Sequence, residues 1–126
     1  MVPRLTVVVV DPSEETGEVL RTALGQGADV LAAKRADQGL DLVRRHQPAL
    51  IVVDEDCDRA WPENLARQYD NESQLHRTPL VVLGTARRRA VLPSGEFVSK
   101  PYHYAPLIRR IEELLERARQ PLVRSA

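Results

Sequence analysis

Residues 48–56 read PALIVVDED, and this stretch decides the fold. Its apolar part, residues 50–53, does not alternate between apolar and polar positions, and it leads directly into a cluster of carboxylates. Uninterrupted runs of Val, Leu and Ile are typical of strands buried on both faces of a parallel sheet. Residues 5–10 and 80–83 form two more such runs. The sequence therefore predicts a parallel sheet in which one strand ends at an acidic residue, Asp54.

Segments with helical spacing separate these runs. Weaker strand-like runs occur at residues 29–33 and 96–98. Apolar residues recur at helical intervals in four places: Val19, Leu20, Ala23 and Leu24; Ala36, Leu40 and Val43; Trp61, Leu65 and Tyr69; and Leu107, Ile108, Ile111, Leu114 and Leu115. Ser13 is the expected N-cap of the first helix. Strands that alternate with helices predict an α/β protein with a five-stranded parallel sheet and helices on both faces.

The composition limits the function classes. The chain has 126 residues, of which 43% are hydrophobic, and its 18 Lys and Arg balance its 18 Asp and Glu. These values indicate one globular domain without the overall basic charge typical of nucleic-acid binding. No apolar run approaches the roughly 20 residues of a membrane span. A single cysteine, Cys57, excludes an internal disulfide. No signal-peptide motif is present, so we expect a cytoplasmic protein.

Two arginine-rich segments are interpreted as solvated surface. One is the run Arg87, Arg88 and Arg89, which follows the fourth predicted strand. The other is the last predicted helix, where arginines alternate with glutamates at spacings that favour ion pairs within the helix.

Chemistry-bearing residues follow the ends of four predicted strands. They are Asp11, Asp54, the pair Gly84 and Thr85, and Lys100. The carboxyl ends of parallel strands meet at one edge of the sheet, where open α/β folds bind ligands. Two neighbouring carboxylates repel each other unless a cation intervenes, and Mg²⁺ prefers such oxygen ligands. A carboxylate beside Mg²⁺ and a lysine is equipped to accept a phosphoryl group. Taken alone, Asp11 is equally typical of a helix cap or turn.

These residues resemble the receiver domain of response regulators, the CheY-like family. The matching segments are VVVVDP (7–12), PALIVVDED (48–56), TPLVVLGTA (78–86) and FVSKPYHYAPLIRRI (97–111). The resemblance implies a three-layer, flavodoxin-like, doubly wound sheet with strand order 2-1-3-4-5. It also implies that residues 1–120 form the receiver-like domain and that residues 121–126 are a frayed tail.

The resemblance assigns roles at the phosphoryl site. Asp54 would accept a phosphoryl group from the phosphohistidine of a histidine kinase or phosphotransfer protein. Lys100 would bind the phosphoryl oxygen. Mg²⁺ would be held by Asp11, Asp54 and the backbone carbonyl of Asp56.

The resemblance also assigns switch residues and partners. Thr85 is the candidate switch hydroxyl, Phe97 holds the aromatic switch position, and Pro101 matches a proline that is commonly preceded by a cis bond. Such a domain signals through protein–protein contacts with an output protein, and homodimerisation is compatible with it. It is not an enzyme beyond its own phosphoryl transfer and autodephosphorylation.

Four departures make this an atypical, degenerate member of the pattern. Pro12 replaces the second acidic residue after the first strand, which weakens or removes Mg²⁺ binding. Counting from Pro79 places the switch position on Gly84, with Thr85 one residue late. Asp58 replaces a proline. Residues 84–96 read GTARRRAVLPSGE and leave room for at most one helical turn, over residues 86–92, so the fourth helix of the family is shortened or missing.

Two functions remain open at this point. The first is a phosphorylatable receiver of a two-component or phosphorelay system, supported by Asp54 and Lys100. The second is a pseudo-receiver that binds partners without phosphorylation, supported by Pro12, Gly84 and the short fourth helix. An unrelated flavodoxin-like binding domain is a third alternative. The acidic segment 11–18 lacks the glycine-rich loop that nucleotide or flavin binding requires.

Overall fold

A computed structural model describes residues 4–57, 62–84 and 92–120. These residues form one sheet of five parallel strands in the order β2-β1-β3-β4-β5. The strands are β1 (Leu5–Val10), β2 (Ala28–Ala33), β3 (Leu50–Asp54), β4 (Leu80–Gly84) and β5 (Gly95–Ser99). The predicted strand order 2-1-3-4-5 is confirmed.

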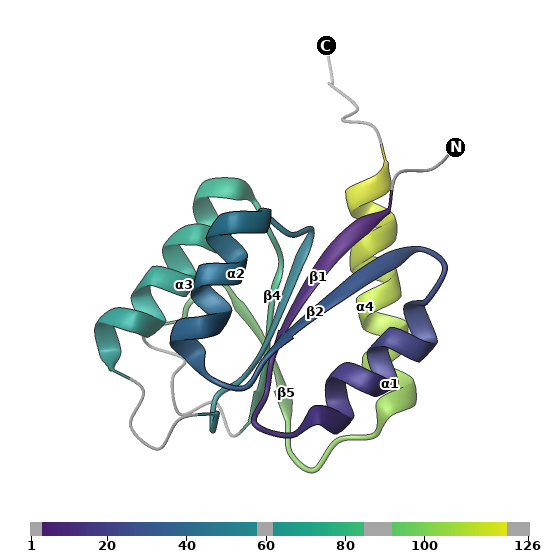
Figure 1. Cartoon of the computed structure of the whole chain (residues 1–126), viewed down its shortest axis with the longest axis horizontal. Coiled ribbons are helices and arrows are strands. Elements are labelled where there is room, and N and C mark those ends of the chain that lie inside the picture. The colour runs from purple at the N-terminus through teal and green to yellow at the C-terminus, as the bar shows by residue number, and fades with distance from the viewer. Residues whose placement is uncertain (1–3, 58–61, 85–91, 121–126) are drawn as a thin grey trace.

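Helices cover both faces of the sheet. They are α1 (Glu14–Leu24), α2 (Ala36–His46), α3 (Glu63–His76) and α4 (Tyr104–Arg119). Figure 1 shows α2 and α3 on one side of the sheet and α1 and α4 on the other. The result is the predicted three-layer arrangement. The carboxyl ends of the strands gather at the lower edge in this view.

The sheet separates two apolar cores because the side chains of successive strand residues point to opposite faces. On the β1 strand, Val7 and Val9 belong to the core under α1 and α4. Val8 and Val10 belong to the core under α2 and α3. Every residue of β3 and β4 is buried. This burial explains why those two strands lack alternation in the sequence.

Helix α1 begins at the predicted N-cap. The Ser13 hydroxyl caps the helix by accepting a hydrogen bond from the Glu15 N–H at 3.2 Å, and Gly25 is the C-cap. The apolar stripe is only partly as predicted: Leu20 is buried, but Ala23 is exposed. The buried face of α1 instead includes the small residues Thr16 and Gly17, which apolar spacing alone does not reveal.

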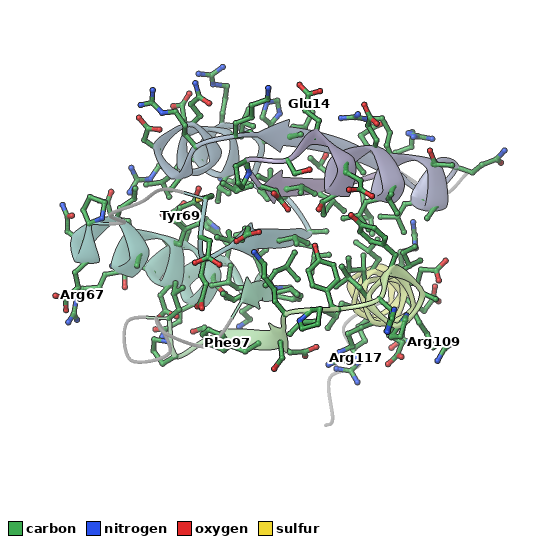
Figure 2. The ribbon with its side chains drawn as sticks, turned by 90° about the horizontal axis from the view of Figure 1, so that it is seen from below. Glu14, Arg67, Tyr69, Phe97, Arg109 and Arg117 are labelled. Atoms are coloured by element: carbon green, nitrogen blue, oxygen red, sulfur yellow. The ribbon has the colours of Figure 1, made fainter. Side chains whose placement is uncertain are left out.

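Tyr69 joins α3 to α2. Its side chain is fully buried, and its hydroxyl donates a hydrogen bond to the backbone carbonyl of Ala36. Gly39 lets the two helices approach, since a Cβ there would lie 2.4 Å from the Tyr69 hydroxyl oxygen. Figure 2 shows the Tyr69 side chain on the inner side of α3, opposite Arg67 on the outer side.

Replacing Tyr69 tests this joint. We expect Tyr69→Phe to lower the free energy of unfolding by about 1 kcal/mol, the usual cost of one buried hydrogen bond. Urea denaturation measures the loss, and its slope should not change. The matched control is Tyr104→Phe on α4, a half-buried tyrosine for which we expect no loss. Equal losses in the two variants would contradict this role for Tyr69.

The connection from β4 to β5 is tied to α3. The buried carboxylate of Asp70 accepts hydrogen bonds from the Ser94 N–H at 2.8 Å and from the Gln74 side chain at 2.9 Å. In the part of this connection that the structure describes, residues 92–94, there is no helix. The predicted helical turn over residues 86–92 lies almost wholly outside the described residues, as do Thr85, Arg87–Arg89, Asp58, Trp61 and the predicted tail, residues 121–126.

An ion pair joins β5 to α4. The Arg110 guanidinium donates to both carboxylate oxygens of Glu96, each at 2.7 Å. This pairing holds the pKa of Glu96 below its usual value of 4.5. A lowered folded-state pKa stabilises the fold above the unfolded value, and the stabilisation is lost as the pH falls through the folded value.

Glu96→Gln should therefore destabilise the folded protein by an amount that depends on pH. We expect its Tm to lie below that of the unaltered protein at neutral pH, by about 2 °C or less because the pair is partly exposed. The difference should shrink as the pH falls below 4.5, where Glu96 becomes protonated. Thermal unfolding followed by circular dichroism at several pH values measures this. A difference that is independent of pH would contradict the ion-pair explanation.

Among the described residues, no helix is both long and apolar enough to cross a membrane.

Candidate functional site

The acidic residues lie at the ends of two neighbouring strands. β1 and β3 pair in parallel with Val10 opposite Val53, so Asp11 and Asp54, the next residue of each chain segment, meet at the same edge of the sheet. Both carboxylate residues are buried, with 7% and 4% of their surface exposed. The sequence-based placement of these two residues is thus reproduced by the register.

Lys100 reaches this edge from the end of β5. Its backbone N–H donates to the Gly84 carbonyl at 3.1 Å, which fixes its position beside β4. Its ammonium donates to Asp54 Oδ2 at 2.6 Å and lies 3.4 Å from Asp56 Oδ2. Asp54 Oδ1 accepts the Asp56 N–H at 2.8 Å. The Asp54 carboxylate is therefore a buried anion with a cation and a backbone donor in direct contact.

Asp11 is held by two donors from the start of α1. Its Oδ1 accepts the Ser13 N–H, and its Oδ2 accepts the Thr16 hydroxyl, both at 2.8 Å. The Thr16 oxygen lies 3.4 Å from the Tyr102 hydroxyl. Burial raises the pKa of the Tyr102 phenol, and the charges of Asp11 and Asp54 raise it further.

Glu55 fills the space beside Gly84. The Glu55 side chain is fully buried, and a Cβ built on Gly84 would lie 2.2 Å from its Cγ and 2.5 Å from its Cδ. Since real Cβ atoms do not approach so closely, position 84 accommodates only glycine while Glu55 keeps this placement. The position at which the sequence count expects a switch hydroxyl is thus taken up by a buried carboxylic side chain.

The remaining predicted site residues lie on or next to β5. The peptide bond between Lys100 and Pro101 is cis, the geometry that the resemblance implies. Phe97 is partly buried and packs against the core under α2 and α3. Figure 2 shows the Phe97 side chain on the α3 side of the sheet, away from α4. Thr85, the candidate hydroxyl, is not among the described residues.

Comparison with solved structures finds the same architecture. A receiver domain of the Francisella response regulator 1452 superposes with a TM-score of 0.70 at 23% identity, covering 91% of this chain and 99% of that one. A two-component response regulator from Clostridium difficile superposes with a TM-score of 0.73 at 13% identity, covering 93% of this chain and 100% of that one. The chain has the receiver fold. The chemotaxis protein CheY4 of Vibrio cholerae agrees, with a TM-score of 0.71 at 17% identity over 89% and 99%. No family model and no curated protein sequence matches.

Within this receiver fold, the donor set at the sheet edge fits a hard cation. The described residues contain no group of three or more His, Cys, Asp or Glu side chains placed to hold a metal ion. Asp11 and Asp54 remain as two carboxylates at this edge of the sheet. Mg²⁺ commonly takes only one or two carboxylates from a protein and completes its shell with water. The chemistry of this smaller set therefore suits Mg²⁺, although Pro12 contributes no ligand.

Three residues of the site were missed by the sequence reasoning or placed differently by it. Thr16 and Tyr102 were not candidates, and Glu55 was treated only as part of the cluster of carboxylates after the third strand, whereas it is buried against Gly84. Thr16 lies one helical turn after the cap Ser13, a spacing that could have indicated a contact back to Asp11. No pattern in the sequence indicates that Tyr102 lies close to Thr16.

Proposed function

We propose that this chain is the receiver of a two-component or phosphorelay system and that Asp54 accepts the phosphoryl group. The observation that supports this most directly is the contact between the buried Asp54 carboxylate and the Lys100 ammonium at 2.6 Å. A carboxylate at a strand end can act as a nucleophile towards phosphorus. A lysine that follows a different strand can neutralise the negative charge of the phosphoryl group.

The transfer is a substitution at phosphorus. A carboxylate oxygen of Asp54 attacks the phosphorus of a phosphohistidine, the new P–O bond forms, and the P–N bond breaks. The departing imidazole keeps the bonding electron pair and takes up a proton. The product is an acyl phosphate, whose extra oxygens the Lys100 ammonium can reach. Water later attacks phosphorus, breaks the P–O bond, and regenerates the carboxylate with release of inorganic phosphate.

Mg²⁺ would be held by Asp11, Asp54 and the backbone carbonyl of Asp56. When bound, it supplies positive charge beside the phosphoryl oxygens. Its affinity should be low, because Pro12 provides no carboxylate at the end of β1. The residues of this chain therefore carry much of the charge neutralisation.

The partners follow from this chemistry. The phosphoryl donor is a histidine kinase or phosphotransfer protein in the cytoplasm, and the output is a protein–protein contact, with homodimerisation as one form of it. Direct binding to nucleic acid is not proposed, because the net charge is zero. No catalytic activity is proposed beyond phosphoryl transfer to Asp54 and its hydrolysis.

The experiment is labelling by a small phosphodonor. The full chain is incubated with phosphoramidate and Mg²⁺, and intact mass is measured beside a receiver known to react. We expect the addition of one phosphoryl group, which is lost in Asp54→Asn and kept in Asp41→Asn. Asp41 is an exposed aspartate on α2 that pairs with Arg45, so it controls for removal of a carboxylate. No addition, with the reference receiver labelled, would overturn the proposal.

A second candidate function is a receiver-like module that binds its partner without phosphorylation. The packing of Glu55 against Gly84 favours it, because a side-chain hydroxyl cannot occur at position 84 to sense a phosphoryl group. Under this alternative, Asp54→Asn would bind the output protein as tightly as the unaltered chain, and phosphoramidate would leave the mass unchanged.

A further inference from the structure

The hydroxyl groups of Thr16 and Tyr102 form a chain of contacts that leads away from Asp11. Asp11 Oδ2 accepts a hydrogen bond from Thr16 at 2.8 Å, and the Thr16 oxygen is 3.4 Å from the Tyr102 hydroxyl. The single proton of the Thr16 hydroxyl is committed to the carboxylate, which is the stronger acceptor. Tyr102 is therefore the donor in its contact with Thr16. The direction of donation runs from Tyr102 to Thr16 to Asp11.

This line of groups is shielded from water at its centre. Thr16 is 2% exposed and Asp11 is 7% exposed. Hydrogen bonds in such surroundings are costly to break, because no solvent molecule replaces the lost partner. Thr16 comes from α1 and Tyr102 from the segment between β5 and α4. The orientation of Asp11 at the end of β1 is thus set by side chains from these two elements. Of the residues assigned to the site, α1 carries none, and the segment after β5 carries Lys100 and Pro101.

We propose that Thr16 is a positioning residue for Asp11, with Tyr102 as its outer support, and that together they orient the only acidic side chain at the end of β1 for Mg²⁺. This inference rests on the metal binding in the proposed function. Because position 12 is proline, the adjacent side chain cannot replace Asp11 as a ligand if Asp11 is turned away from the metal. Groups that orient a ligand from behind typically change metal affinity by about 10- to 100-fold when they are removed.

The test measures the Mg²⁺ dissociation constant of the full chain by titration of amide NMR signals at the sheet edge. We expect Thr16→Val to raise this constant about tenfold. Thr16→Ser, which keeps the hydroxyl, should stay within about twofold of the unaltered protein. Tyr102→Phe should raise the constant about threefold, since its contact with Thr16 is long.

Two control variants separate positioning from stability. Ser13→Ala removes the hydroxyl that caps α1 but leaves the Ser13 N–H, so it weakens the helix without removing a donor to Asp11. Tyr104→Phe alters the aromatic neighbour whose ring meets that of Tyr102 edge-on. Both should keep the Mg²⁺ dissociation constant of the unaltered chain.

Each outcome has a defined meaning. Weaker Mg²⁺ binding in Thr16→Val with rescue in Thr16→Ser supports the inference, whether or not phosphoramidate labels Asp54. Failure of labelling alone counts against the proposed function only. Unchanged binding in Thr16→Val, an equal change in Ser13→Ala, or absence of Mg²⁺ binding to the unaltered chain would each overturn the inference.

Discussion

Gly84→Thr is expected to destabilise the protein by about 3 kcal/mol, the upper range for overpacking a core. The threonine Cβ would lie 2.2 Å from the Glu55 Cγ. Glu55 is fully buried, and the described residues have no buried side-chain polar atom without a hydrogen-bond partner. Its side chain therefore cannot swing into solvent without losing buried interactions. Urea denaturation of the single variant measures the loss.

A double variant isolates the cause of this loss. Glu55→Ala removes the atoms that obstruct position 84, so the losses of Glu55→Ala and Gly84→Thr should not add in the combined variant. We expect the combined loss to fall short of the sum by at least about 1 kcal/mol. Gly25→Ala, at the end of α1 and at negative φ, is the glycine control; its Cβ would lie 3.2 Å from the Arg21 carbonyl oxygen, so the loss should be much smaller than for Gly84→Thr. Additive losses would show that Glu55 is not the obstruction.

Lys100→Met is expected to slow phosphoramidate labelling of Asp54 by about 100-fold or more, the usual effect of removing one preorganised charge-stabilising group. The ammonium is in direct contact with the Asp54 carboxylate at 2.6 Å. Methionine keeps most of the side-chain length but has no charge. The fold should also lose stability at neutral pH, because the buried Asp54 carboxylate is left without its cation.

The chain offers a matched control for this variant. Lys34, the only other lysine, is exposed and pairs with Glu14 on the surface. Lys34→Met should keep the full labelling rate. If the combined variant Lys100→Met with Asp54→Asn regains stability, the stability lost in Lys100→Met is due to the unpaired charge of Asp54. A labelling rate for Lys100→Met close to that of Lys34→Met would contradict the role assigned to Lys100.

Much of the fold was predictable because buried parallel strands leave a clear signal. Every position of β3 is shielded on both faces, so selection for apolar residues makes a run that is visible in one sequence. The ends of the strands were predictable because polar residues interrupt the apolar runs there, although Asp11 and Asp54 are themselves buried. The helix faces were less predictable: Ala23 fits the apolar spacing but is exposed, while the small residue Gly17 packs against Ala32.

The parts of the site that escaped prediction depend on contacts between distant segments. Strand register alone brings Asp11 and Asp54 together, so rules for parallel sheets suffice. The contact between Thr16 and Tyr102 spans 86 positions of the chain and depends on how α1 sits beside the segment after β5. The burial of Glu55 against Gly84 depends on side-chain packing, which residue type does not disclose. A glutamate in an acidic run has the composition of a solvated loop.

The cation of the site comes from the last strand of the sheet. Lys100 lies 46 positions after Asp54, and among the described strands β5 pairs only with β4. During synthesis, a chain that has emerged only as far as β4 has the Asp54 carboxylate but not the ammonium that balances it. The ion pair between Asp54 and Lys100 therefore forms only after β5 has joined the sheet. A nascent or proteolytically shortened chain without β5 would carry an unbalanced buried charge, which opposes stable folding of the fragment.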